Sequence, residues 1–390
     1  MDPLLPAYRK GELADLTSEV FRKSGSLAAQ IPSNVVRRRV ASLVREMNSY
    51  YSNLIEGHKT LPRDIEKAMR EDFSSNPEQR ANQRLNKAHI EVEQLMVERL
   101  QKEPALLIHS AEFICWLHRE FYSRVPAELH WSQNRSGEKY QIQPGVMRDF
   151  EVEVGQHQPP FHRSLPQFMQ RFQEVYGSDT VVATDQLIAL AAAHHRLAWI
   201  HPFGDGNGRV TRLYSHAWLV RTKVDSFGLW TLSRGLARDR DKYFQALSAA
   251  DQKRWNDLDG RGNLSDRALS EFCVFILKTM VDQIDFMSGL FQFDVLSKRI
   301  DRYLQIERVD LRPREREALS KLLRAALIEG EIERGRAAEI LGNSASAARL
   351  IVRLALDEGL LDSSSAKGPL ALVFSAETLE SYFPKLYSLG

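Results

Sequence analysis

A segment of a dozen residues, 201–212 (HPFGDGNGRVTR), combines residue types that could act on a phosphate ester. Gly206 and Gly208 flank Asn207 directly before a predicted helix, so the backbone can turn tightly and present N–H groups that lack an intrahelical partner. Helix N-termini with exposed N–H groups bind anions, phosphate above all. The spacing therefore predicts an anion-binding turn at the start of this helix.

Four charged or titratable residues surround that turn. Arg209 and Arg212 lie three residues apart on the predicted helix, hence on one face, where both can reach the same chain of phosphates. Asp205 would repel a phosphate unless a cation lay between them, and Mg²⁺ bridges such pairs. A neutral imidazole, with a pKa of about 6.5 in water, can accept a proton from an attacking hydroxyl, and His201 lies one short loop away. Together these residues predict phosphoryl or nucleotidyl transfer.

Each part of the segment has an ordinary structural explanation when it is taken alone. A Gly-x-Gly before a helix is more often a turn than a phosphate site, and an arginine pair is usually a solvated helix face. A histidine after a helix end is often only a cap. Their conjunction within one dozen residues favours the chemical interpretation.

The segment resembles the signature of the Fic family, His-x-Phe-x-Asp/Glu-Gly-Asn-Gly-Arg-x-x-Arg, and matches it at every fixed position. The resemblance extends over roughly residues 35–290. It implies an all-α fold, a helical core with a short β-hairpin flap. It also implies a protein adenylyltransferase, which uses Mg²⁺ to transfer AMP from ATP to a Ser, Thr or Tyr hydroxyl of a target protein or of itself.

The resemblance also implies a role for each matched residue. His201 would be the general base, Phe203 would anchor the loop in the core, and Asp205 would hold Mg²⁺ against the α- and β-phosphates. Tyr243 is interpreted either as a neighbour of the nucleotide base or as a core residue. The phosphates would be bound by the backbone of Gly206, Asn207 and Gly208, by Arg209 at the β-phosphate and by Arg212 at the γ-phosphate.

A second motif, SNLIEG, ends the first long predicted helix and is similar to the Fic inhibitory motif, Ser/Thr-x-x-x-Glu-Gly/Asn. Ser52 and Glu56 are four residues apart and share a helix face. If Glu56 pairs with Arg212, that arginine is no longer available to bind the γ-phosphate, and the carboxylate also repels the phosphate. The alternative is a solvated helix end with a glycine cap. In some relatives this glutamate is implicated in removing AMP, so the net direction stays open.

Most of the remaining chain has helical periodicity. Helices are predicted at 34–56, 62–72, 76–102, 105–125, 165–176, 183–199, 239–259 and 264–290, and another begins at the turn before 209. The segment FEVEV, 150–154, alternates apolar and acidic residues, which predicts a short strand bounded by Gly155. This strand would be the flap of the Fic resemblance. A target protein docked on residues 148–160 could pair with its edge.

Beyond about residue 300, three short helical patterns precede a predicted hairpin, an order typical of a winged helix-turn-helix. We therefore predict an N-terminal helical region with the inhibitory helix (1–100), a Fic catalytic core (101–298) and a winged helix-turn-helix domain (299–390). Arg349 and Arg353 share a face of the recognition helix and could contact DNA. Acidic residues nearby offset them, so protein contacts or a homodimer fit equally well; these are Glu331, Glu333 and Glu339.

The composition is that of an ordinary globular protein: 390 residues, 43% hydrophobic, 27% charged and a net charge of +2. The two cysteines form no disulfide or metal pattern, and neither a signal peptide nor a membrane-spanning run is present, so we expect a cytoplasmic protein. Two rivals to the adenylyltransferase remain. One is an enzyme that removes AMP or transfers another nucleotidyl or phosphoryl group. The other is a nucleotide-sensing DNA-binding regulator, which the intact His201 disfavours.

Overall fold

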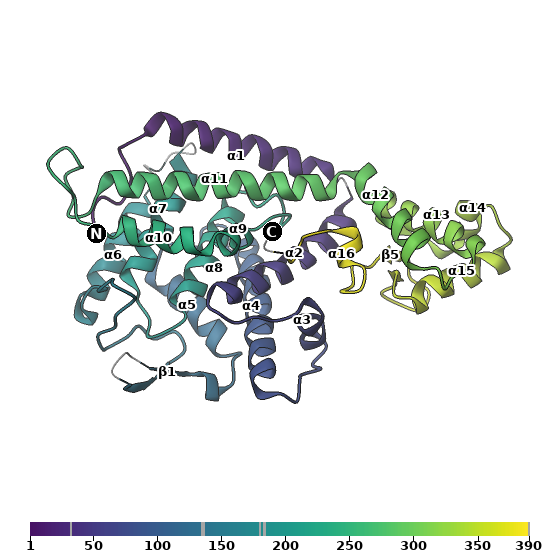
Figure 1. Cartoon of the computed structure of the whole chain (residues 1–390), viewed down its shortest axis with the longest axis horizontal. Coiled ribbons are helices and arrows are strands. Elements are labelled where there is room, and N and C mark those ends of the chain that lie inside the picture. Colours follow the sequence, from purple (N-terminus) through teal and green to yellow (C-terminus); the bar gives the residue numbers. More distant parts are fainter. Residues whose placement is uncertain (32, 134–136, 179–180, 182–184, 389–390) are drawn as a thin grey trace. The chain divides into compact units, whose positions relative to one another are not determined.

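The computed structural model describes residues 1–31, 33–133, 137–178, 181 and 185–388. Helices dominate, and the described strands form two small antiparallel sheets, which is the all-α class expected from the sequence (Figure 1). The chain divides into two compact units. Unit 1 contains residues 1–24, 48–225 and 231–284, and unit 2 contains 25–47, 226–230 and 285–390. The division into three domains stays a prediction.

Two helices form the centre of unit 1, α7 (Gln186–Ile200) and α8 (Asn207–Arg221). Both are buried along nearly their whole length. Small and apolar residues form most of α7, whereas α8 also buries polar side chains such as Arg209, Arg212 and His216. They pack against each other, α7 also contacts α6, and α8 also contacts α4 and α5. The other helices of unit 1 are α3 (Pro62–Met69), α4 (Pro77–Lys102), α5 (Ala111–Tyr122), α6 (Leu165–Tyr176), α9 (Leu232–Arg238) and α10 (Arg240–Ala250).

Three long helices have residues in both units: α1 (Lys10–Gln30), α2 (Asn34–Ile55) and α11 (Asp266–Phe291). The helices predicted at 34–56, 76–102, 165–176 and 264–290 are confirmed to within two residues. The first two residues of the helix predicted at 183–199 lie outside the described part of the chain, and the rest of it is α7.

Three predicted helices are shorter in the structure, and the one expected over 62–72 ends at Met69. The helix expected over 239–259 already ends at Ala250. Most of the following residues are polar, and the two large apolar ones, Trp255 and Leu258, are 85% and 96% exposed and so have nothing to pack against. The helix expected over 105–125 begins only at Ala111. The Ser110 hydroxyl accepts a hydrogen bond from the Phe113 amide at 3.1 Å and caps it there.

The prediction of a strand at 150–154 is wrong, because no strand forms there. Two other strands, β1 (Trp131–Gln133) and β2 (Lys139–Gln141), form the antiparallel hairpin of unit 1, whereas the predicted segment takes part only in an isolated bridge between Val154 and His157. The alternation of Phe150 to Val154 has a physical basis of another kind: Glu151 turns toward the ring and amide of His162. A strand needs a neighbouring strand, and the pattern of one segment cannot supply it.

Unit 2 ends in helices and a three-stranded antiparallel sheet of order β3-β5-β4. Its elements are α12 (Phe293–Arg302), a π-helical turn (Tyr303–Glu307), α13 (Pro313–Glu329), β3 (Glu331–Ile332), α14 (Ala337–Leu341), α15 (Ala345–Asp357), β4 (Leu361–Asp362), β5 (Leu370–Leu372) and α16 (Leu379–Tyr382), besides one short 3-10 turn (Arg334–Arg336). The predicted hairpin is present as β4 and β5. The winged-helix assignment stays a prediction, and residues 389–390 of that domain lie outside the described ones.

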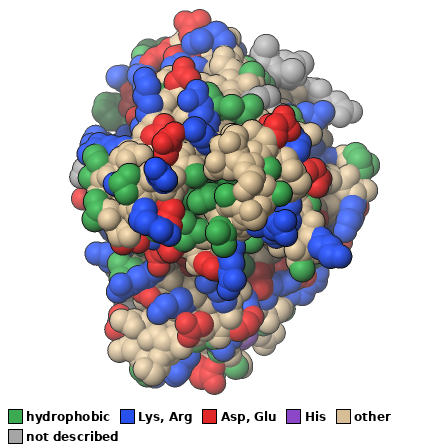
Figure 2. All heavy atoms as spheres, turned by 90° about the vertical axis from the view of Figure 1, so that its right-hand side faces the viewer, with side chains coloured by type: hydrophobic (Ala, Val, Ile, Leu, Met, Phe, Trp, Pro, Cys, Tyr) green, Lys and Arg blue, Asp and Glu red, His purple; other side chains and the backbone are tan. Residues whose placement is uncertain are grey.

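The surface charges of the chain are mixed in sign. In the view of Figure 2, Lys and Arg side chains are interspersed with Asp and Glu, and no patch of a single sign covers the visible described surface. On α15, Arg353 is 78% exposed and lies 3.5 Å from Asp357. DNA contact through Arg349 and Arg353 therefore remains a prediction without support from this charge distribution. No helix in the described part of the chain is long and apolar enough to span a bilayer.

Candidate active site

The loop between α7 and α8 takes a sharp turn that only particular residues permit. His201 caps α7 with a left-handed backbone, φ 50°, and Pro202 prevents the helix from continuing. Gly206 precedes α8 with φ 79°, where a Cβ would be strained and would also lie 2.8 Å from the Tyr122 ring. Glycine is thus required at this position for both conformation and space.

Phe203 and Asn207 hold the loop in place. The Phe203 ring is fully buried and stacks on His118 with centroids 3.9 Å apart. The Asn207 amide closes the loop, because its Oδ1 accepts from the Phe203 amide at 2.9 Å and its Nδ2 donates to the Phe203 carbonyl at 2.8 Å. The Asn207 side chain is therefore committed to the loop, and what it can offer an anion is its backbone N–H.

Asp205 is held next to the start of α8. Its carboxylate accepts a hydrogen bond from the Tyr122 hydroxyl at 2.9 Å and lies 3.5 Å from Arg209. Burial alone would raise the pKa of Asp205, but the charge of Arg209, the Gly206 amide and the Tyr122 hydroxyl outweigh it and lower the pKa. The side chain remains 44% exposed, so an ionised carboxylate faces the open site.

One carboxylate of this kind fits Mg²⁺ that is bound mainly through a nucleotide. Mg²⁺ in nucleotide sites takes one or two carboxylates and fills its remaining positions with phosphate oxygens and water. Within the described residues, no group of three or more His, Cys, Asp or Glu side chains could hold a metal ion by itself. The donor set therefore suits a metal that arrives with its substrate.

The imidazole of His201 lines the pocket and is neutral at physiological pH. Burial lowers the pKa of His201 to about 4, with the charges of Arg148 and His157 acting in the same direction. Arg148 also fixes the backbone at this point, because its Nε donates to the His201 carbonyl at 2.9 Å and its amide donates to the Pro202 carbonyl at 2.9 Å. The ring is thus held in place in the form that can accept a proton.

Arg209 has unused hydrogen-bonding capacity. Its side chain is 5% exposed and lies over the Phe121 ring at 5.0 Å. Its Nε and Nη1 have no hydrogen-bond partner among the described residues. A buried guanidinium with two open donors beside a helix N-terminus suits an anionic ligand.

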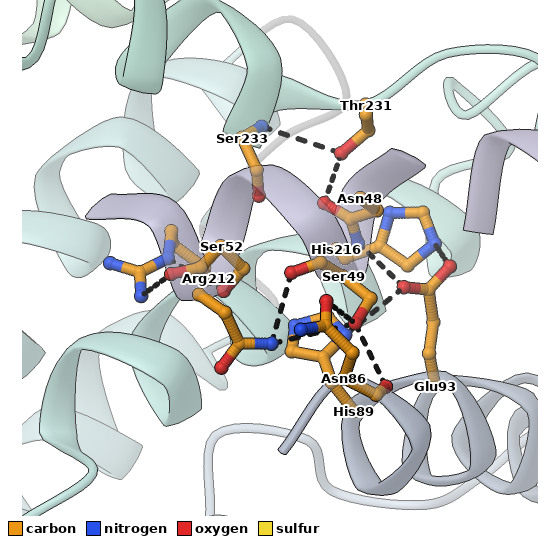
Figure 3. Close-up of polar contacts among 11 residues, drawn as sticks. Asn48, Ser49, Ser52, Asn86, His89, Glu93, Arg212, His216, Thr231 and Ser233 are labelled. Carbon is orange, nitrogen blue, oxygen red and sulfur yellow. Dashed lines mark hydrogen bonds and ion pairs between the residues drawn. The ribbon is translucent and has the colours of Figure 1, made fainter. Parts of the chain in front are cut away.

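Arg212, by contrast, is occupied by the end of α2. Its Nε donates to the Ser52 hydroxyl at 2.9 Å, and its Nη2 donates to the Ser52 carbonyl at 2.9 Å and to Glu56 Oε1 at 2.6 Å (Figure 3 shows the Ser52 contacts). Burial acts to raise the pKa of Glu56, but Arg212 and Arg209 outweigh it and lower the pKa. The Glu56 carboxylate also fills the space above Gly208, where a Cβ would overlap Oε1.

A pocket of about 450 Å³ extends from the start of α8 to α10. Its polar end is formed by Gly208, Arg212 and Glu56, with His201 beside them. The rest of its lining includes Trp199, Tyr243, Phe244, Leu247 and Asp251, together with Val154 to His157. Tyr243 is 2% exposed and its hydroxyl lies 2.7 Å from His194 Nε2, so it is both a core residue and part of the pocket wall.

Comparison with known proteins agrees with this geometry. The model of the Fic/DOC family matches residues 108–219. The chain carries a Fic domain. The Protein adenylyltransferase Fic of Drosophila erecta is 33% identical over 111 residues, which is 28% of this chain and 21% of that protein. The matched part thus spans about a fifth of the length of this curated relative.

Two solved structures have a similar fold. A Fic family protein from Desulfovibrio desulfuricans G20 superposes with a TM-score of 0.54 at 16% identity and covers 95% of this chain and 98% of its own. A Fic domain containing signaling protein from Bacteroides thetaiotaomicron VPI-5482 gives a TM-score of 0.53 at 20% identity, with 70% and 95% covered. These two structures support the fold.

The structure brings together the site residues singled out in the sequence, three of which, Ser52, Glu56 and Tyr243, lie outside the matched residues 108–219, and it adds several that sequence reasoning missed. Five residues of the two motifs line the pocket together with Tyr243, namely His201, Asn207, Gly208, Arg212 and Glu56. The others adjoin this set, since Asp205 lies 3.5 Å from Arg209 and Ser52 accepts from Arg212. Trp199, Leu247 and Asp251 were not singled out. A signal for two of them exists, since Tyr243, Leu247 and Asp251 recur every four residues and so share one side of the chain at α10.

Proposed function

We propose that this Fic-domain protein is a protein adenylyltransferase, which transfers AMP from ATP to a hydroxyl of a protein, and that Glu56 restrains it. The observation that carries the proposal is the pocket. Its wall joins a neutral His201 to the helix N-terminus at Asn207 and Gly208, and the next residue of α8, the buried Arg209, has two open donors. The adenylyltransferase named among its relatives supports the same reaction.

In the proposed reaction, the target hydroxyl oxygen attacks the α-phosphorus of ATP. The bond from the α-phosphorus to the bridging oxygen breaks, pyrophosphate leaves, and His201 takes the hydroxyl proton. The backbone amides at the start of α8 and Arg209 would hold the phosphate oxygens. Asp205 would hold Mg²⁺, which neutralises part of the phosphate charge when it is bound.

Glu56 would act by competition. Arg212 donates to Glu56 at 2.6 Å, and a carboxylate over Gly208 occupies space beside the α8 N-terminus. A γ-phosphate would have to displace that carboxylate or bind without Arg212. The Glu56 carboxylate could also serve hydrolysis of the product, in which it would orient a water that attacks the α-phosphorus, so that free AMP forms and the target hydroxyl leaves.

A target segment would approach along residues 154–157, which border the pocket. Arg148 ties this region to the loop, because it donates to the carbonyls of His201, Phe150 and Pro160. Residues 148–160 are the proposed docking place for a target segment; the Val154 side chain there is 39% exposed, whereas the N–H and C=O of Val154 already pair with His157, so the segment would use other groups of this region. The protein itself is the first target to examine.

The test is intact-mass spectrometry of the Glu56→Gly variant after incubation with ATP and Mg²⁺. We expect mass additions of one AMP, which His201→Ala in the same background abolishes. Chase of the modified protein with wild type would reveal removal of AMP. The proposed function is wrong if the Glu56→Gly variant gains no mass of AMP from ATP. It is also wrong if the additional His201→Ala substitution leaves AMP incorporation unchanged.

A further inference from the structure

The last two turns of α2 are fixed by buried polar groups. Asn48 donates from Nδ2 to Glu93 Oε2 at 2.6 Å, and Thr231 donates to Asn48 Oδ1 (Figure 3). Glu93 Oε1 lies 3.4 Å from His216 Nε2. We call Asn48, Glu93, His216 and Thr231 the Glu93 cluster. All four are buried, with exposures from 2% to 6%.

The Glu93 cluster lies on the same helix faces as the proposed inhibitory contact between Glu56 and Arg212. Asn48, Ser52 and Glu56 recur every four residues and so share one face of α2, and Arg212 and His216 do the same on α8. Along these contacts the residue numbers rise on α2 while they fall on α8. Asn48 meets the cluster that holds His216, and the later residues Ser52 and Glu56 meet the earlier Arg212.

A second set of hydrogen bonds secures the neighbouring face. The Ser49 hydroxyl donates to the Asn86 carbonyl at 2.8 Å, and Asn86 Nδ2 donates to the Thr60 hydroxyl at 2.9 Å. Asn53, which is fully buried, donates to the Ser49 carbonyl at 3.0 Å. The end of α2 is therefore held by donors and acceptors that must match in position, in addition to its buried apolar side chains Tyr51 and Ile55.

Glu93 is the component of the cluster whose burial is most costly. A buried carboxylate is strongly unfavourable unless hydrogen bonds compensate it, and Asn48 provides one of them from α2. His89, one turn earlier on α4, adds no positive charge, because burial, with Arg212 and His216, lowers its pKa to about 3. The carboxylate is thus satisfied while the end of α2 is docked, and water can satisfy it when the segment leaves.

We propose that Glu93 and Asn48 are positioning residues that set how tightly Glu56 restrains the enzyme. Their hydrogen bond joins α2 to α4, and Glu93, which also lies 3.4 Å from His216, relates both helices to α8; this arrangement holds Glu56 over Gly208. This inference concerns the regulation of the proposed active site and rests on the proposed function. It predicts that substitutions two turns away from Glu56 release the brake without touching the pocket.

The test exchanges donor and acceptor. Asn48→Asp is nearly isosteric and places a second carboxylate against Glu93. It should raise both amide hydrogen exchange in residues 48–56 and AMP incorporation, the latter about tenfold, equivalent to about 1.4 kcal/mol. The double variant Asn48→Asp with Glu93→Gln restores a donor and an acceptor in reversed order, so both readouts should return to within about threefold of wild type. Asn34→Asp, at an exposed position of the same helix, is the matched control and should change neither.

Three results would overturn the inference. The first is unchanged exchange and labelling in Asn48→Asp, and the second is a double variant that is no better restrained than the single one. The third is a tenfold rise from Asn48→Asp when Glu56→Gly is already present, because no brake is then left to release. Hydrogen exchange keeps this inference separate from the proposed function. An inactive Glu56→Gly variant would refute the adenylyltransferase, whereas loss and recovery of protection in residues 48–56 report on the Glu93 cluster alone.

Discussion

Replacing Glu56 by glutamine should release only part of the restraint on the enzyme. The substitution keeps the shape of the side chain and an oxygen that can accept from Arg212, but it removes the negative charge. Glu56→Gly removes both. Comparison of the two variants separates the charge of the proposed brake from the space that it fills above Gly208.

The size of the charge contribution follows from the contact. Glutamine still accepts a hydrogen bond from the charged Arg212, so the difference between the two side chains is the Coulomb attraction of the carboxylate, about 4 kcal/mol at about 4 Å for an effective dielectric constant of about 20. The bond from Arg212 to Glu56 is 2.6 Å long, and the Glu56 side chain is 31% exposed, so solvent screening reduces the difference to about 1 kcal/mol. This corresponds to a rise of about fivefold in AMP incorporation at low ATP.

The assay is the initial rate of labelled AMP transfer over a range of ATP concentrations. Glu56→Gln should lower the apparent KM for ATP about fivefold, and Glu56→Gly should lower it further. Glu56→Asp is the control that keeps the charge on a shorter side chain. A glutamine variant with wild-type kinetics would refute the electrostatic part of the reasoning, and one equal to Glu56→Gly would refute the part assigned to occupied space.

Three further predictions concern the loop, and all use the Glu56→Gly background for activity. The kcat/KM of the Glu56→Gly variant should stay constant from about pH 8 to about pH 5 and fall near pH 4. Burial lowers the pKa of His201 to about 4, and the base is lost only when it is protonated. A fall in kcat/KM near pH 6.5 would contradict this. Tyr122→Phe removes a hydrogen bond from Asp205 and should raise the Mg²⁺ concentration for half-maximal transfer about tenfold; an unchanged requirement would show that Asp205 needs no such support. Phe203→Ala should cost about 3–5 kcal/mol in the free energy of unfolding, measured by urea denaturation, and a loss under about 1 kcal/mol would mean that the ring does not anchor the loop.

Local signals in the sequence predicted most helices and the residues of the loop. The turn from His201 to Asn207 depends on residues that are adjacent in the chain, so its composition alone indicates the geometry. The strand proposed for 150–154 failed because pairing depends on a partner elsewhere, and the alternation carried no information about that partner.

The remaining parts of the site come from tertiary packing. Glu93 is one of several acidic residues in α4 and would ordinarily be assigned to a solvated face, yet it is 4% exposed against α2 and α8. Asp251 follows the end of α10, and only the fold brings it to the pocket that contains His201. The role of single polar residues such as Glu93 and Asp251 depends on neighbours that are distant in sequence.

The absence of a side chain at Gly208 has a consequence for how the enzyme would respond to its nucleotide supply. The vacant volume over this residue can hold either the carboxylate of the same chain or a ligand, so the protein carries its own competitor at a fixed local concentration. This competitor multiplies the apparent dissociation constant for ATP by the reciprocal of the fraction of molecules in which the Glu56 carboxylate does not occupy this volume. Changes in α2 or α4 could thereby adjust the ATP level at which transfer begins while every residue of the catalytic loop stays the same.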